Sequence, residues 1–346
     1  MIGDRRLRAA FADQARACRS LESPFMGQLC EVLSENLRRG TPLTDRLFDW
    51  EGELGPRHAS VPLRVCGALH ALRLRGNEQL AAVYPPAKVK GSELWSAVQS
   101  VLSEEAAFID AFIDSAPQTN EVRRSGTILP AAQVVANRFG LPFRMMELGA
   151  SGGLNLIWDR VRVETNQGAF GAAEPVLTLS PYWTGSLPTD ATVTVVSKAA
   201  VDLNPLDPRD PDDALRLKAY LWADQPERLE LTRAAIAATE VPVEKGDAID
   251  WLARRIKIGA DGHVRFIYTT VAWQYFPPEA QARGTALIEA EGERATDTSP
   301  IAWFGMENDG TQPGAVLTLR LWPGDEKISL GRADFHGRWI DWRYSG

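Results

Sequence analysis

The residues best suited to chemistry lie in a short glycine-rich stretch, residues 147–155, near the middle of the 346-residue chain. An apolar run carries Glu147 near its end and then breaks into a loop that contains Gly149, Ser151 and Gly153. Apolar residues resume directly after the loop, which is the pattern of a strand, a tight turn and a helix N-terminus. Glycines in such a turn let a ligand approach the backbone, and the first N–H groups of the helix can then bind it.

The position of Glu147 relative to the glycines limits which classes of ligand the loop could bind. In a dinucleotide-binding fingerprint, G-x-G-x-x-G, the key acid follows about 20 residues after the glycines, on the next strand. Here Glu147 precedes the glycines and gives E-x-G-x-S-x-G, which disfavours a nicotinamide-dependent oxidoreductase. An ordinary strand-to-helix turn without a ligand is the other interpretation, because glycines mark turns of many kinds.

Two further acids follow predicted strands. Asp202 ends the strand predicted at residues 193–201, the place from which an acid hydrogen-bonds ribose hydroxyls. An Asp-Asn-Pro turn explains Asp202 equally well. Asp247 follows a third predicted strand, residues 241–243, and as a simple alternative it caps the next helix.

The stretch 118–126 is dense in hydrogen-bonding side chains and lies between two helical patterns. One interpretation is a loop with a helix cap, for which Asn120 and Ser125 are suitable residues. The other is a wall of the ligand cleft, in which Glu121 and Arg123 contact a polar substrate. The sequence does not decide between the two.

Composition sets the outer bounds. The chain is 45% hydrophobic and 24% charged, which is typical of a globular protein, and its net charge of −7 argues against a nucleic-acid-binding surface. No apolar segment approaches the length of a membrane span, the three cysteines form no C-x-x-C pair, and the four histidines show no metal-ligand spacing. We therefore expect a cytoplasmic protein with reduced thiols, no resident metal, and no membrane or nucleic-acid partner.

The elements that must position these residues form two groups. Residues 1–125 carry helical periodicity and predict an all-helical N-terminal domain; Leu7, Phe11, Ala15 and Cys18, for example, share one helical face. Residues 126–346 alternate between strand and helix patterns, with an inserted hairpin near residues 158–190. The fold class predicted is α/β: a doubly wound, mostly parallel sheet with a terminal antiparallel hairpin.

The E-x-G-x-S-x-G pattern resembles the first motif of S-adenosylmethionine-dependent methyltransferases, (D/E)-x-G-x-G-x-G, with Ser151 in place of the middle glycine. The segments 118–125, 202–207 and 273–275, with the closing Trp-Pro-Gly and His-Gly segments, extend the likeness along nearly the whole chain. Together they are similar to a bacterial family of unknown function that has a methyltransferase-like domain behind a helical region. The family often carries histidine where this chain has Thr269.

The resemblance implies S-adenosylmethionine as cofactor and transfer of a methyl group to an unknown acceptor. Separately, we expect a small-molecule substrate rather than a macromolecule. The cofactor-binding residues that it implies are Glu147, Gly149, Ala150, Ser151, Gly153, Asn155, Asp202, Asp247 and Ala248. The substrate-binding candidates are Gln118, Asn120, Arg123, Trp273 and Gln274, and the candidate bases are Glu121, Tyr275 and His336. Trp273 and Tyr275 have a structural alternative as aromatic plugs over the sheet. A protein that binds an adenosyl cofactor or nucleotide without chemistry is the alternative function.

Overall fold

The computed structural model describes residues 2–56, 58–258 and 261–345, and these form two compact units. The helical unit contains residues 1–119 and 210–230, and the α/β unit contains residues 120–209 and 231–346. The helical unit is therefore discontinuous in the chain. The sequence had predicted a single boundary at residue 125, with residues 210–230 in the α/β domain.

The helical unit is built from amphipathic helices around one apolar core. Its helices are α1 (Ile2–Ser20), α2 (Pro24–Asn36), α3 (Pro42–Phe48), α4 (Val61–Leu74), α5 (Glu78–Val83), α6 (Gly91–Glu104), α7 (Ala106–Phe112) and α9 (Pro211–Ala219). All four residues of the predicted face of α1 are buried. α6 and α7 are separate helices, because the backbone at Glu105 leaves the helical conformation (φ −108°, ψ 21°).

Residues 210–230 belong to this unit because several of their side chains complete its core. Tyr220 packs so closely on α4 that a Cβ atom at Gly67 would lie 2.5 Å from its ring. His70 Nδ1 lies 3.2 Å from the carbonyl oxygen of Ala219, so this buried histidine is a packing residue. The Asp224 carboxylate accepts hydrogen bonds from the Ser23 hydroxyl and the Phe25 N–H group.

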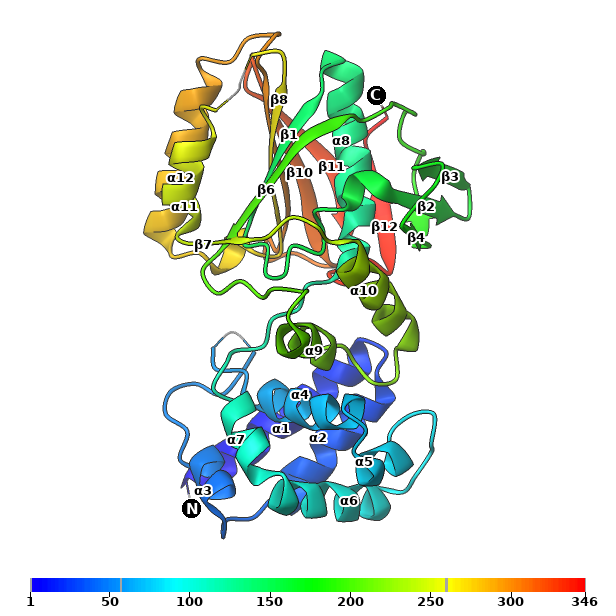
Figure 1. Ribbon diagram of the computed structural model, residues 1–346, viewed down its shortest axis with the longest axis vertical. Helices are drawn as coiled ribbons and strands as arrows, with labels where there is room; N and C mark the ends of the chain where they lie inside the picture. Colours follow the sequence, from blue (N-terminus) through cyan, green and yellow to red (C-terminus); the bar gives the residue numbers. More distant parts are fainter. Residues whose placement is uncertain (1, 57, 259–260, 346) are drawn as a thin grey trace. The chain divides into compact units, whose positions relative to one another are not determined.

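A nine-stranded sheet forms the centre of the α/β unit (Figure 1), in the order β5-β12-β11-β10-β9-β8-β1-β6-β7. Its strands are β1 (Phe143–Leu148), β5 (Tyr182–Thr184), β6 (Val195–Asp202), β7 (Glu244–Lys245), β8 (Val264–Thr270), β9 (Ile301–Glu307), β10 (Ala315–Trp322), β11 (Glu326–Ala333) and β12 (Trp339–Trp342). Strands β7, β6, β1, β8 and β9 pair in parallel, whereas β9 to β12 form an antiparallel meander. The predicted mixed α/β class, with a mostly parallel sheet and a terminal antiparallel hairpin, is confirmed.

One difference concerns the end of the sheet, where β11 was not identified from the sequence. Residues 335–338 form the turn that precedes β12. β11 begins with Glu326 and Lys327 and carries Gly331 and Arg332 near its end, so its apolar alternation is weak.

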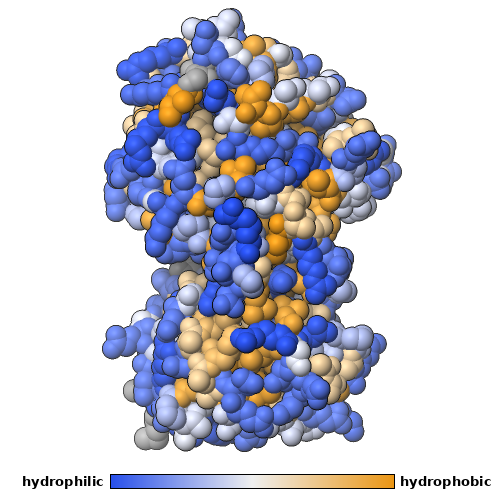
Figure 2. Space-filling view, viewed as in Figure 1, coloured by the Kyte–Doolittle hydropathy of each residue, from blue (hydrophilic) through white to orange (hydrophobic). Residues whose placement is uncertain are grey.

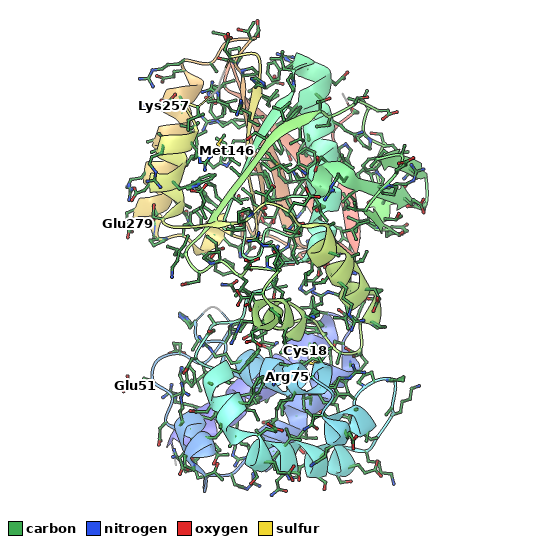
Figure 3. The ribbon with its side chains drawn as sticks, in the orientation of Figure 1. Cys18, Glu51, Arg75, Met146, Lys257 and Glu279 are labelled. Carbon is green, nitrogen blue, oxygen red and sulfur yellow. The ribbon has the colours of Figure 1, made fainter. Side chains whose placement is uncertain are left out.

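Helices cover both faces of the sheet (Figure 1). α8 (Ser125–Phe139) lies on one face, and α11 (Ala248–Arg255) and α12 (Pro278–Gly292) lie on the other. α10 (Pro226–Ala238) begins in the helical unit and ends in the α/β unit. Met146 lies in the core between the sheet and helices α11 and α12, whereas Lys257 and Glu279 lie at the solvent-exposed surface (Figure 3). Because side chains alternate along a strand, Met145 and Glu147 face the α8 side.

The segment after β1 differs from the prediction. No α-helix follows the glycine loop; residues 151–157 form turns and lead into the short 3-10 helix η2 (Trp158–Arg160). An antiparallel hairpin, β2 (Val161–Thr165) with β3 (Gly168–Gly171), comes next, and β4 (Leu177–Leu179) pairs with β2 in parallel. The inserted segment thus takes the place of the usual crossover helix.

The face drawn in Figure 2 is mostly hydrophilic, and its apolar side chains gather most on the helical unit, in the lower half of the view. Among the residues described, no helix is both long and apolar enough to cross a membrane.

Candidate active site

The candidate site lies at the carboxyl edge of the sheet, which we define as the ends of β1, β6, β8 and β9. From β1 the chain goes to β6 on one side, and it later returns to β8 on the other side of β1. The order of strands therefore reverses at β1. In open α/β sheets, ligands bind at such a switch point, outside the carboxyl ends of the strands.

The glycine loop follows β1 at this point and is held by β6. The N–H groups of Gly149 and Ala150 both donate to the carbonyl oxygen of Val201, at 2.9 and 3.1 Å. The Ser151 N–H donates to Asp202 Oδ2 at 2.8 Å. Gly149 has φ +73° and Ser151 has φ +55°, so the loop needs left-handed backbone that glycine adopts readily.

Asp202 joins the loop to the end of β6. Its Oδ2 accepts from Ser151, and its Oδ1 accepts from the Asn204 N–H at 2.9 Å. The turn predicted after this strand is therefore present. It also places a half-buried carboxylate beside the glycine loop, as the alternative ligand-binding interpretation requires.

The polar stretch before α8 binds the other side of the loop. Asn120 Oδ1 accepts hydrogen bonds from the N–H groups of Gly152 and Leu154, at 3.1 and 3.0 Å. Asn155 Nδ2 donates to the carbonyl oxygen of Glu121 at 3.3 Å, and its Oδ1 accepts from the Ser125 hydroxyl at 2.8 Å. These contacts satisfy loop N–H groups and hold residues 152–155 in turns, where the sequence predicted a helix N-terminus.

Glu147 is buried at the end of β1, with 2% of its surface exposed. Its Oε2 accepts from the Tyr268 hydroxyl of β8 at 3.2 Å. Burial raises the pKa of Glu147 to about 8, because the ionised form would lose its hydration. At neutral pH the side chain is therefore a neutral carboxylic acid.

The loops after β1 and β8 touch. A Cβ atom at Gly149 would lie 2.7 Å from the Cβ of Ala272. Val271, between β8 and Ala272, has φ +55°, which is strained for a β-branched residue. Strained backbone concentrates at functional sites, and here it lies at the strand that neighbours the switch point.

Glu307, at the end of β9, holds the loop after β8. Its carboxylate accepts from the backbone N–H groups of Ala272 and Trp273 at 3.1 Å and of Gln274 at 3.3 Å. Burial raises the pKa of Glu307 in spite of these donors. Glu307 was not among the residues predicted from the sequence, although it is an acid at the end of an apolar strand, as Asp202 is.

Arg124 was also missed. It is buried in η1 (Val122–Arg124), where it donates to the carbonyl oxygens of Thr270 and Phe335 at 2.8 and 3.0 Å. Its neighbour Arg123 forms an ion pair with Glu121, with 3.2 Å between Nε and Oε1. Gly337 packs against Arg123, since a Cβ atom there would lie 2.8 Å from the Cβ of Arg123.

The three candidate bases lie in different environments. Glu121 is buried and paired with Arg123, whereas Tyr275 is 64% exposed in the 3-10 helix η3 (Trp273–Tyr275). His336 lies in the half-buried turn whose residue Gly337 packs on Arg123. The structure therefore brings the Glu121 and His336 segments together through Arg123 and Arg124.

Most of the remaining predicted residues make contacts that stabilise the fold, such as helix caps and aromatic packing. Asp247 caps α11, accepting from the N–H groups of Ile249 and Asp250 at 3.0 and 2.9 Å, and Ala248 is buried behind it. Trp273 packs against Trp303 and Phe276. Gln274 Oε1 accepts from the Asn308 N–H at 2.7 Å. Gln118 is half-buried and belongs to the helical unit.

No group of three or more potential metal ligands occurs among the residues that the structure describes. Two cavities in the α/β unit lie away from the candidate residues. One, of about 250 Å³, is lined by Lys198 of β6 and Asp159, and the other, of about 440 Å³, by Trp339 and Arg332.

Residues 8–342 match the model of a family described as "Uncharacterized protein conserved in bacteria (DUF2332)". The chain belongs to this family. The resemblance to a bacterial family of unknown function is thereby confirmed over nearly the whole chain, and its methyltransferase component stays a prediction. No curated protein matches the chain, and no solved structure does.

Proposed function

We propose that this protein binds S-adenosylmethionine at the carboxyl edge of the sheet and acts as a methyltransferase on a small acceptor. The position of Asp202 carries the proposal. In the order β7-β6-β1-β8-β9 its strand is the second, and an acid at that point addresses the ribose hydroxyls of a nucleotide. A carboxylate offers about four acceptor positions. The Ser151 and Asn204 N–H groups use two, which leaves capacity for a diol.

The charge at the edge supports the same ligand class. Asp202 and Asp247 both end or follow strands there, and a cofactor with a sulfonium and an ammonium group complements acidic side chains. The cofactor would supply the activated methyl group. The protein would bind and orient it through Asp202 and the glycine loop, with the loop after β8 set in place by Glu307.

A second function, adenosyl-cofactor or nucleotide binding without chemistry, is favoured by the environment of Glu121. Its Oε1 already accepts from the backbone N–H and the Nε of Arg123, both at 3.2 Å, and the side chain is 1% exposed. A base must reach the proton that it removes. Glu121 meets that requirement only if its ion pair opens.

The test of binding is calorimetric titration with S-adenosylmethionine and S-adenosylhomocysteine. Asp202→Asn removes the charge and keeps the side-chain shape, and we expect at least about tenfold weaker binding. Asp190→Asn, the same change at an exposed position, is the matched control and should bind normally. Gly149→Val is a poor probe, because its Cβ would collide with Ala272 whether or not a cofactor binds there.

Absence of binding by the intact protein at millimolar ligand would refute the proposal. If binding is present, incubation with cofactor labelled in its methyl group and pooled small metabolites separates the two functions. Label that leaves the cofactor and appears in a metabolite identifies an enzyme. Binding with no transfer identifies the non-catalytic function.

A further inference from the structure

The side chain of Asn120 occupies two backbone donors of the glycine loop. Asn120 is buried, and its Oδ1 accepts from both the Gly152 and the Leu154 N–H groups. Two N–H groups that converge on one oxygen atom form the kind of concavity that binds a phosphate oxygen. In this protein the side-chain amide of Asn120 takes the place of that oxygen.

We propose that Asn120 is a specificity-determining residue that makes the carboxyl edge accept a phosphate-free adenosyl compound and reject adenine nucleotides that carry phosphates. This inference rests on the proposed function and deepens it. The amide is tethered to the chain and neutral, so it satisfies both donors without bringing a charge into the loop. A phosphate would have to displace it before it could bind.

The neighbouring donor reinforces the selection. The Ser151 N–H, next in the loop, donates to the carboxylate of Asp202 at 2.8 Å. A phosphate that approached this part of the loop would meet a negative charge at hydrogen-bonding distance from the backbone, and like charges at such distances repel. The loop thus presents one neutral and one acidic acceptor where a nucleotide-binding loop presents free N–H groups.

The experiment measures binding of S-adenosylhomocysteine, ADP and inorganic pyrophosphate to three proteins: the natural protein, Asn120→Ala and Asn120→Asp. The natural protein should bind S-adenosylhomocysteine at least about tenfold more tightly than ADP. Asn120→Ala frees the two N–H groups and should gain at least about tenfold in affinity for pyrophosphate and ADP. Asn120→Asp is the matched control, since it keeps an acceptor oxygen and adds a charge, and should gain nothing.

Hydrogen exchange of the peptide that contains residues 149–155 shows whether the substitution acts as intended, because the Gly152 and Leu154 amides should exchange faster in Asn120→Ala. Faster exchange without any gain in pyrophosphate binding would overturn the inference. Equal affinity of the natural protein for ADP and S-adenosylhomocysteine would overturn it too, even if Asn120→Ala failed to fold. Asn120→Ser, with a shorter polar side chain, provides a second variant for the same measurements.

The outcomes separate this inference from the proposed function. If the natural protein binds S-adenosylhomocysteine and Asn120→Ala gains no phosphate affinity, the adenosyl site stands and the role of Asn120 fails. If the natural protein binds none of the three ligands and Asn120→Ala binds pyrophosphate, Asn120 does exclude phosphate, and the adenosyl proposal fails.

Discussion

Replacing Glu147 by glutamine should make the α/β unit more stable at neutral and alkaline pH. The carboxyl group is buried at the end of β1, and burial raises its pKa from an ordinary 4.5 to about 8. The folded protein therefore holds a proton that the unfolded chain releases between these two values. Because the folded state binds more protons than the unfolded state in this range, the free energy of unfolding falls as pH rises from 4.5 to 8.

The magnitude follows from the size of that interval. One pKa unit corresponds to about 1.4 kcal/mol, so the natural protein should lose roughly 3 kcal/mol between pH 4.5 and pH 7 and roughly 5 kcal/mol by pH 8. Glutamine has nearly the same shape, is neutral at every pH, and can accept the Tyr268 hydroxyl through its amide oxygen. The Glu147→Gln protein should therefore lack this part of the pH dependence.

Urea unfolding followed by tryptophan fluorescence, at a series of pH values from 4 to 9, measures the difference. The two proteins should be similar near pH 4 and diverge steadily above it, with the variant the more stable. Glu293→Gln, the same change at an exposed site on the C-terminal side of α12, is the control and should follow the natural protein. Parallel pH profiles for Glu147→Gln and the natural protein would mean that folded Glu147 is ionised at pH 7 and would refute the reasoning.

Three further predictions concern the loop after β8 and the helical unit. Glu307→Ala leaves three backbone N–H groups without their acceptor and should lower the unfolding free energy by about 2–4 kcal/mol in denaturant titrations, with Glu307→Gln less affected. The neighbouring Cys30 thiol and burial raise the pKa of the Cys18 thiol, so the folded protein should react with an aromatic disulfide reagent far more slowly than the unfolded chain does. Rapid labelling of the folded protein would contradict this. Burial lowers the pKa of His70 to about 4, so the helical unit should lose stability as pH falls from 6.5 towards 4, by up to about 1.4 kcal/mol per pH unit. His70→Gln should remove that slope, and an unchanged slope would exclude His70 as its source.

Local patterns predicted much of the fold. Short apolar runs within β1, β6 and β8, namely 145–146, 199–201 and 266–267, are buried, as expected of central parallel strands whose two faces are covered. The face of α1 that carries Leu7 and Phe11 is buried as its spacing predicts. Each of these patterns involves residues that are close together in the chain, so each can be recognised from the sequence alone.

The errors arose where distant residues decide the local structure. A helix after the glycine loop was a reasonable prediction from the loop itself. Asn120, about 30 residues earlier, supplies the acceptor for the Gly152 and Leu154 N–H groups and stabilises turns in its place. Two other contacts are equally long-range: the packing of Gly149 against Ala272, and the hydrogen bonds that Glu307 accepts from the loop after β8. At the candidate site, the sequence therefore identified the acids and glycines but not the partners that limit what each can do.

The discontinuity of the helical unit has a consequence for how the protein is made. α4 and the segment before α2 do not have their packing partners until Tyr220 and Asp224 have been synthesised. By then β1 and β6 have been translated, while β8, the other neighbour of β1, has not. Neither unit can therefore finish folding before part of the other has been synthesised. A truncation at residue 119 or 230 would leave one hydrophobic core incomplete. We expect the two units to be inherited, expressed and degraded as one piece.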